Sequence, residues 1–237
     1  APSILEPGPI NRSQIEAMTL RNHMSVSGTW LFRWRSFLPL VLVVPTLVAM
    51  RGYTWPFGSH RLQECWEALC YSVSLAGLAV RVATVGFAPA KTSGRNTRYQ
   101  QAAQLNTTGM YSIVRHPLYV GNYLMFLGVS LFPREWWVPV LVSIAFFFYY
   151  ERIIYVEEEF LQNNFGAQFD AWAAKTSAFF PRIGRWTSPE LPFSVRTVLR
   201  REYSGLLGIV FAFFVLESVE NYAVLKHVVL DIELTVC

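Results

Sequence analysis

Apolar residues fall into five long runs that polar and basic segments separate. The runs cover approximately residues 30–50, 65–88, 118–132, 136–156 and 205–229. A helix needs ~20 mainly apolar residues to cross a bilayer, so the pattern predicts an all-α, polytopic membrane bundle with about five transmembrane helices. Pro39 and Pro45 interrupt the first run, and Glu217, Glu220 and Asn221 share one face of the fifth.

The third and fourth runs are joined by a very short link, Pro133-Arg134-Glu135. A link of this length folds two helices into an antiparallel hairpin. The segment before the third run and the segment after the fourth therefore return to the same side of the membrane. His116 belongs to the first of these segments and Glu158 to the second, so we expect them to face each other.

Composition supports a membrane protein and charge indicates its orientation. Of the 237 residues, 53% are hydrophobic and only 15% are charged, against about 25% charged residues in an ordinary soluble domain. Residues 1–36, 89–117 and 157–204 hold 14 of the 20 Lys and Arg residues. The positive-inside rule places these segments in the cytoplasm. The net charge of +4 is then explained by cytoplasmic loops, and nucleic-acid binding is not predicted.

The runs divide the chain into four segments. Residues 1–29 form a polar arm, and residues 30–108 contain two membrane helices with a cytoplasmic loop. Residues 109–185 contain the hairpin and most groups that could do chemistry. Residues 186–237 form an interfacial segment and the last membrane helix. The fold class that we expect also includes a cytoplasmic C-terminal catalytic segment. The three cysteines form no Cys-x-x-Cys pair, and no metal site is predicted.

The first candidate site is Arg115-His116-Pro117 at the start of the third run. Proline suits the first helical turn because its missing N–H has no intrahelical partner to lose. The amides of that turn, Arg115 and the Tyr111 hydroxyl could together receive a ligand that bears a carboxylate. A plain helix cap with an interfacial arginine and a hydrogen-bonded histidine explains the same pattern equally well.

The second candidate is the acidic triplet Glu157-Glu158-Glu159 after the fourth run. Three acids in this position are typical of a solvated helix face. A buried member could instead accept hydrogen bonds from ribose hydroxyls or from an ammonium group. Successive helical residues point ~100° apart, so a metal ion shared by the triplet is not expected.

Taken together, these residues resemble the isoprenylcysteine carboxyl methyltransferase family and its phospholipid methyltransferase relatives. The resemblance covers residues 109–182, and the two spans before it lie outside. It rests on an ordered set of motifs: Gly109-x-Tyr111, Arg115-His116-Pro117-x-Tyr119-x-Gly121, Gly128, Glu157-Glu158-x-x-Leu161, Phe165-Gly166 and Pro181.

The resemblance implies an integral-membrane enzyme that transfers a methyl group from S-adenosylmethionine to a lipid-like acceptor. It implies a cofactor site made of Tyr111, Arg115, His116, Pro117, Leu118, Tyr119, Gly121 and Glu157. Two residues are implied as catalytic. Arg152 would hold an anionic acceptor oxygen, and Glu158 would close the pocket or act as a base for an amine.

Alternatives remain open for the acceptor and for the protein class. The acceptor could be a prenylcysteine carboxylate, a lipid phosphate or a phospholipid amine, and an anionic oxygen is the leading expectation. Membrane lipids are expected partners. A non-catalytic transporter or scaffold is the competing class, because Arg81, Glu217 and Glu220 could line a polar pathway.

Overall fold

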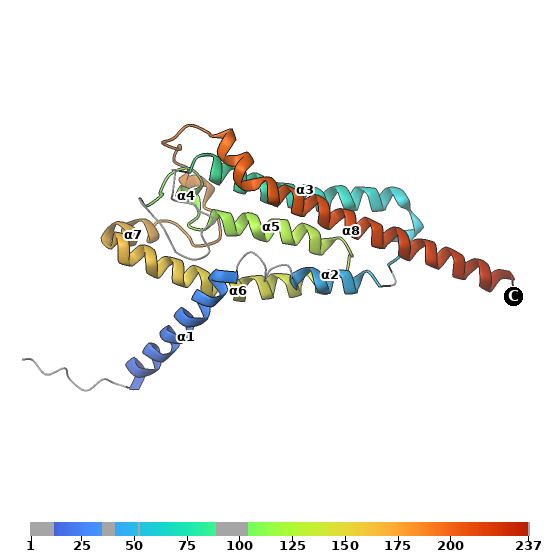
Figure 1. The fold of residues 1–237 in the computed structure, drawn as a ribbon, viewed down its shortest axis with the longest axis horizontal. Coiled ribbons are helices and arrows are strands. Elements are labelled where there is room, and N and C mark those ends of the chain that lie inside the picture. Colours follow the sequence, from blue (N-terminus) through green and yellow to red (C-terminus); the bar gives the residue numbers. More distant parts are fainter. Residues whose placement is uncertain (1–11, 35–40, 52, 89–103, 237) are drawn as a thin grey trace, which may run out of the picture.

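The chain is described by a computed structural model over residues 12–34, 41–51, 53–88 and 104–236, with side chains placed from residue 22 to residue 224 of these ranges. Every regular element in this part of the chain is helical. Four long helices run side by side (Figure 1). They are α3 (His60–Gly86), α5 (Pro117–Leu131), α6 (Trp137–Phe165) and α8 (Val195–Val236).

The other elements are one longer helix and five short ones. Helix α1 (Arg12–Trp34) leans away from the bundle and packs on α6 (Figure 1). The short elements are α2 (Val43–Ala49), η2 (Pro56–Gly58), α4 (Met110–Ile113), α7 (Ala167–Ala173) and η3 (Ile183–Arg185). Figure 1 shows α4 and α7 at the end of the bundle where α5 begins and α6 ends.

Helix α5 is the central layer of the bundle. It packs against α3 on one side and against α6 on the other, and α8 covers α3. The α5–α6 pair is the hairpin that the short link predicted. Pro117 occupies the first turn of α5 with His116 as the N-cap residue, also as predicted.

Three described helices are long and apolar enough to cross a membrane: His60–Gly86, Trp137–Phe165 and Val195–Val224. Helix α5 is apolar but shorter. Together these are four of the five predicted spans. We conclude that the chain is an integral membrane protein.

The first predicted span is not one continuous helix in the described part of the chain. Helix α1 ends at Trp34, residues 35–40 lie outside the described ranges, and α2 has only 7 residues. The predicted count of five transmembrane helices is therefore not confirmed. In the sequence, Arg33, Arg35, Pro39 and Pro45 interrupt this apolar run.

The last helix begins earlier than the apolar pattern indicates. The fifth run starts near residue 205, whereas α8 starts at Val195. The Ser194 hydroxyl accepts a hydrogen bond from the Thr197 amide at 3.3 Å, which satisfies one free donor of the first turn. Arginines at 196, 200 and 201 then continue the helix because arginine is a good helix former. The expected cytoplasmic segment is therefore partly the start of α8.

Small residues bring α3 and α5 into close contact. A Cβ on Gly77 would lie 2.5 Å from the carbonyl oxygen of Gly121, and a Cβ on Gly128 would lie 2.5 Å from that of Cys70. Such contacts are common where membrane helices cross, since association there depends on close packing. They fix α5 against α3, so the N-terminal end of α5 is held firmly beside the candidate site.

Candidate active site

Backbone hydrogen bonds hold the Arg115-His116 segment in place. The amide of Arg115 donates to the carbonyl of Ser177 at 2.9 Å, and the amide of His116 donates to that of Ala178 at 3.2 Å. The amide of Arg182 returns a bond to the Ile113 carbonyl at 2.9 Å. The chain after α7 therefore runs beside the segment that leads into α5, although the two are far apart in sequence.

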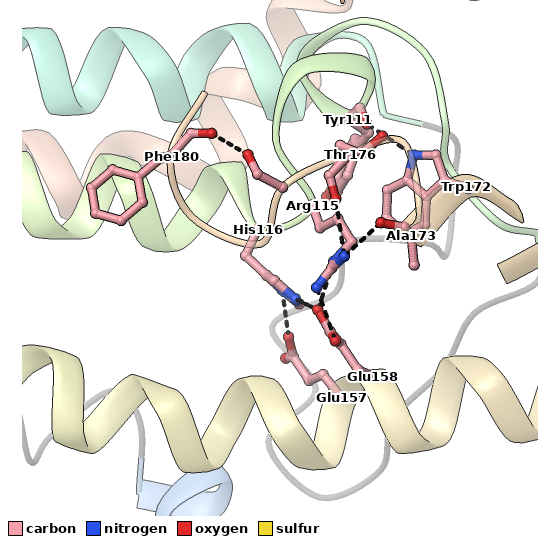
Figure 2. A network of polar contacts seen from close by, with 10 residues as sticks. Tyr111, Arg115, His116, Glu157, Glu158, Trp172, Ala173, Thr176 and Phe180 are labelled. Atoms are coloured by element: carbon pink, nitrogen blue, oxygen red, sulfur yellow. Dashed lines mark hydrogen bonds and ion pairs between the residues drawn. The ribbon is translucent and has the colours of Figure 1, made fainter. Parts of the chain in front are cut away.

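Arg115 joins three elements through one guanidinium group (Figure 2). Its Nε and Nη2 donate to Oε1 and Oε2 of Glu158 on α6, at 2.8 and 3.2 Å. Its Nη1 donates to the carbonyls of Ala173 and Thr176, both at 2.9 Å. A planar guanidinium is suited to such a fork. Arg115 therefore fixes the end of α7 and the acidic part of α6 relative to the start of α5.

His116 lies between the two adjacent carboxylates of α6 (Figure 2). Its Nε2 is 2.9 Å from Oε1 of Glu158, and its Nδ1 is 3.5 Å from Oε2 of Glu157. Burial by itself would lower the pKa of His116, but the hydrogen bonds and charges of the two carboxylates outweigh it and raise the pKa above its usual 6.5. The carboxylates therefore favour the protonated form of this imidazole.

Tyr119 adds a hydroxyl and an aromatic ring to the same cluster. Its hydroxyl donates to Oε1 of Glu157 at 2.5 Å. Its ring stacks beside His116, with 5.7 Å between ring centroids, and lies 4.5 Å from the ring of Tyr150. We call Arg115, His116, Tyr119, Glu157 and Glu158 the carboxylate network. It combines acceptors, donors and an aromatic face in one half-buried place.

Tyr111 lies close enough to the network for the charge of Glu157 to affect the pKa of its phenol. Burial, and then the charge of Glu157, raise the pKa of the Tyr111 phenol, while Arg201 and Arg81 act in the opposite direction. Its backbone carbonyl accepts a hydrogen bond from the Trp172 indole at 3.1 Å (Figure 2). Tyr111 is thus held in place beside the carboxylates.

The remaining predicted site residues lie elsewhere around this network. Pro117 is buried in the first turn of α5 and Leu118 is half-buried there. Gly121 faces α3, since a Cβ on it would lie 2.5 Å from Cγ of Arg81 and 2.7 Å from the Gly77 carbonyl. The backbone at Arg152 packs on α1, because a Cβ on Gly28 would lie 2.4 Å from its carbonyl oxygen. The structure brings neither Gly121 nor Arg152 into the carboxylate network.

A second polar group, which the sequence analysis did not assemble, lies on the α3 side of α5. Arg81 forms a bidentate ion pair with Glu202 of α8, with Nε to Oε2 at 2.7 Å and Nη2 to Oε1 at 2.9 Å. Its Nη1 donates to Oδ1 of Asn122 at 2.6 Å, and the Asn122 amide donates to the Tyr150 hydroxyl at 3.0 Å. Through the rings of Tyr150 and Tyr119 this group adjoins the carboxylate network.

The sequence contained partial signals for this second group. Arg81 is a charged residue within the second apolar run, and Asn122 is a polar residue within the third. Glu202 and Tyr150 carried no such signal. Glu202 follows two arginines in a basic stretch, and Tyr150 is one aromatic residue among five consecutive ones.

Comparison with known proteins identifies relatives of two kinds. The chain is 29% identical over 190 residues to the nickel-cobalt-cadmium resistance protein NccN of Alcaligenes xylosoxydans xylosoxydans, covering 79% of this chain and 75% of that protein. It is 36% identical over 129 residues to the cobalt-zinc-cadmium resistance protein CzcN of Cupriavidus metallidurans, covering 54% and 56%. It is 29% identical over 115 residues to a protein-S-isoprenylcysteine O-methyltransferase of Schizosaccharomyces pombe, covering 48% and 47%.

No solved structure matches the chain at a significant level. Residues 73–168 match the phospholipid methyltransferase family. This range begins inside α3, earlier than the resemblance indicated, and therefore includes Arg81 as well as the carboxylate network. This match and the isoprenylcysteine methyltransferase relative confirm the resemblance: residues 73–168 are similar to the phospholipid methyltransferase family.

Proposed function

We propose that this protein is a membrane methyltransferase that uses S-adenosylmethionine to methylate an anionic oxygen of a lipid-like acceptor at the cytoplasmic face. The observation that carries the proposal is the carboxylate network. Its residues come from the start of α5 and from the later part of α6, which meet at the open end of the hairpin. All of them lie within the segment that matches the family.

The side chains of the network fit the groups of the cofactor. S-adenosylmethionine bears an ammonium, a sulfonium and ribose hydroxyls, all of which interact favourably with carboxylates. Glu157 and Glu158 would hold these groups, and the rings of Tyr119 and Tyr111 would lie against the sulfonium. The N-terminal end of α5 offers a favourable place for the cofactor carboxylate. When bound, the cofactor supplies an activated methyl group whose carbon bonds to the acceptor as the C–S bond breaks and its electron pair stays on sulfur.

The protein itself needs to align the acceptor and exclude water. Both oxygens of Glu158 accept hydrogen bonds from Arg115, and Oε1 also contacts His116. A carboxylate held in this way is better suited to binding positive charge than to removing a proton. This favours an anionic oxygen, which needs no base, over a phospholipid amine.

Two arginines are candidates for binding the acceptor. Arg152 is proposed from the family resemblance, and Arg81 is proposed from its place beside Asn122 and Tyr150. We expect replacement of the true clamp by glutamine to raise the KM for the acceptor at least tenfold while cofactor affinity stays within twofold. Testing Arg81→Gln and Arg152→Gln side by side makes each the control for the other.

The direct test is incubation of purified protein with radiolabelled S-adenosylmethionine and a total lipid extract. We expect label in one anionic lipid class and its loss in His116→Ala. Label in an amine-bearing phospholipid would instead support N-methylation by the same site. Absence of both cofactor binding and label would refute the proposal and leave a non-catalytic transporter or scaffold as the alternative.

A second candidate function is a contribution to metal resistance. It rests on the names of two relatives, which are called resistance proteins for nickel, cobalt, cadmium or zinc. Deletion of the gene should then lower growth in these metals. Complementation with the His116→Ala variant would tell whether the resistance needs the carboxylate network.

A further inference from the structure

The chain that leads into α8 forms a loop at the end of the bundle that holds the carboxylate network (Figure 1). We call residues 180–194 the strap. The amide of Gly109 donates to the carbonyl of Thr187 at 2.9 Å, and the amide of Ser194 donates to that of Gly86 at 2.8 Å. These bonds fix the strap against the segment that precedes α4 and against the end of α3.

Large apolar side chains of the strap point away from the rest of the protein. Phe180, Ile183 and Trp186 are 75%, 78% and 50% exposed, and Figure 2 shows the Phe180 ring directed away from the carboxylate network. A group of large apolar side chains at a surface marks a place where another surface or a membrane covers it. Aromatic residues beside a membrane helix commonly lie at the level of the lipid headgroups.

The same stretch of chain carries an excess of positive charge. Residues 180–200 contain four exposed arginines and one acid, Glu190. The arginines are at positions 182, 185, 196 and 200. The guanidinium of Arg185 donates to the backbone carbonyl of Lys175 at 2.7 Å, and this neutral partner leaves its charge in place. Positive and apolar groups therefore alternate on one surface.

The exposed face of α8 shows where this surface lies relative to the bilayer. Arg196, Arg200, Tyr203, Leu207 and Phe211 follow one another at helical spacings of three and four, so they share a face. The last three are 53%, 60% and 68% exposed and belong to a helix that is long and apolar enough to cross a membrane. This face therefore meets lipid, and the two arginines before it reach the headgroup layer.

Two kinds of partner could cover a surface of this composition, an acidic soluble protein or the headgroups of the surrounding membrane. The continuity of the arginines with the lipid-facing side of α8 favours the membrane. Clusters of arginine beside a membrane helix attract anionic headgroups, because the negative surface potential of such lipids complements their charge.

We infer that the strap and the first two turns of α8 form a binding surface for anionic phospholipid headgroups, in the leaflet at the carboxylate-network end of the bundle. The arginines would bind the phosphates, and the apolar side chains of the strap would lie between the headgroups. This surface goes beyond the proposed function and does not depend on it.

The first test asks whether the strap lies among lipids. The full chain carries Cys65→Ser and Cys237→Ser and is placed in nanodiscs of phosphatidylcholine and phosphatidylglycerol, and Cys70 is buried and stays unlabelled. A fluorophore is attached at Ile183→Cys, and its quenching by brominated lipid is measured. We expect quenching several-fold stronger than at Asn164→Cys, an exposed position in the last turn of α6. Helix α6 has 29 residues, more than a ~30 Å hydrocarbon core requires, so its last turn reaches water.

The second test asks whether the surface selects headgroup charge. Energy transfer from the tryptophans to pyrene-labelled lipid should be stronger for phosphatidylglycerol than for phosphatidylcholine at equal content, and added salt should reduce this preference. Arg182→Gln combined with Arg200→Gln should at least halve the preference. Arg51→Gln combined with Arg61→Gln removes the same charge from exposed positions at the opposite end of α3 and should leave the preference unchanged. An unchanged melting temperature shows that each variant is folded.

Three results would overturn this inference. Equally weak quenching at positions 183 and 164 would place the strap in water and leave its surface to a soluble acidic partner. Equal energy transfer to both lipids would exclude recognition of headgroup charge. A preference that is lost in the Arg51 and Arg61 variant, and kept in the Arg182 and Arg200 variant, would assign it to the other end of the bundle.

Discussion

Arg115 and Glu158 form a two-point ion pair across 43 residues of sequence, with Nε to Oε1 at 2.8 Å and Nη2 to Oε2 at 3.2 Å. The side chains are 17% and 24% exposed, so water screens the pair only partly. Because Arg115 precedes α5 and Glu158 lies in α6, the pair closes the open end of the hairpin. It also fixes the carboxylate that His116 contacts.

Arg115→Lys should destabilise the protein without changing the net charge. A lysine has one nitrogen and cannot reach Glu158, Ala173 and Thr176 together. Because the pair is only partly exposed, we expect a loss of ~2–4 kcal/mol in the free energy of unfolding. Thermal unfolding in detergent, followed by tryptophan fluorescence, measures this loss. Arg182→Lys, at an exposed position, is the control, and an equal melting temperature for both variants would contradict the prediction.

Tyr119→Phe should weaken S-adenosylmethionine binding and leave the fold intact. The hydroxyl donates to Glu157 at 2.5 Å, and a hydrogen bond to a charged group contributes about 1.5–3 kcal/mol. We expect affinity to fall roughly tenfold to a hundredfold, measured by isothermal titration calorimetry. Tyr123→Phe is a matched control, since its hydroxyl bonds Ser143 at 2.9 Å, away from the carboxylates. Equal affinities in the two variants would exclude Glu157 orientation as the role of Tyr119.

The raised pKa of His116 predicts a pH-dependent stability. The folded state holds the proton more tightly than the unfolded state, in which the pKa is close to 6.5. The stabilisation is therefore complete below pH 6.5 and is lost as pH rises through the folded pKa. Melting temperature measured from pH 6 upward should decline for the unaltered chain.

The matched variants separate His116 from other titrating groups. His116→Gln should flatten the decline, whereas His60→Gln, at an exposed position, should retain it. A melting temperature that rises with pH over this range would contradict a raised pKa of His116 in the folded protein.

Gly121→Ala should disturb the crossing of α3 and α5. The added Cβ would lie 2.5 Å from Cγ of Arg81 and 2.7 Å from the carbonyl of Gly77. Part of the contact is with backbone, so the helices must separate, at a cost of ~1–3 kcal/mol. Gly208→Ala in α8 meets no atom within 4 Å and is the control. Thermal unfolding of the pair checks this, and equal stability would show that the crossing can relax.

Much of the fold followed from local properties of the sequence. Hydrophobic runs predicted the helices α3, α5, α6 and α8, and Pro117 marked the start of α5. The three-residue link then required α5 and α6 to be antiparallel. Contact between His116 and Glu158 is a consequence of that connection, and the structure confirms it at 2.9 Å.

The sequence did not determine which faces of the helices meet. Arg81 and Glu202 are 121 residues apart, and Gln63 and Glu220 are 157 apart. Their pairing depends on how α3 and α8 are rotated about their axes. Likewise, Tyr119 and Gly121 share one turn but face α6 and α3 respectively.

The sequence alone therefore determined a membrane bundle, its hairpin and the end at which its imidazole and carboxylates gather. These depend on hydrophobicity, helix length and a short connection, which neighbouring residues specify. Only the tertiary structure decided that Arg115 binds Glu158, that Arg81 pairs with α8 and that Arg152 stays apart. Helix rotation and crossing are set by the packing of side chains from distant segments, and no local pattern encodes them.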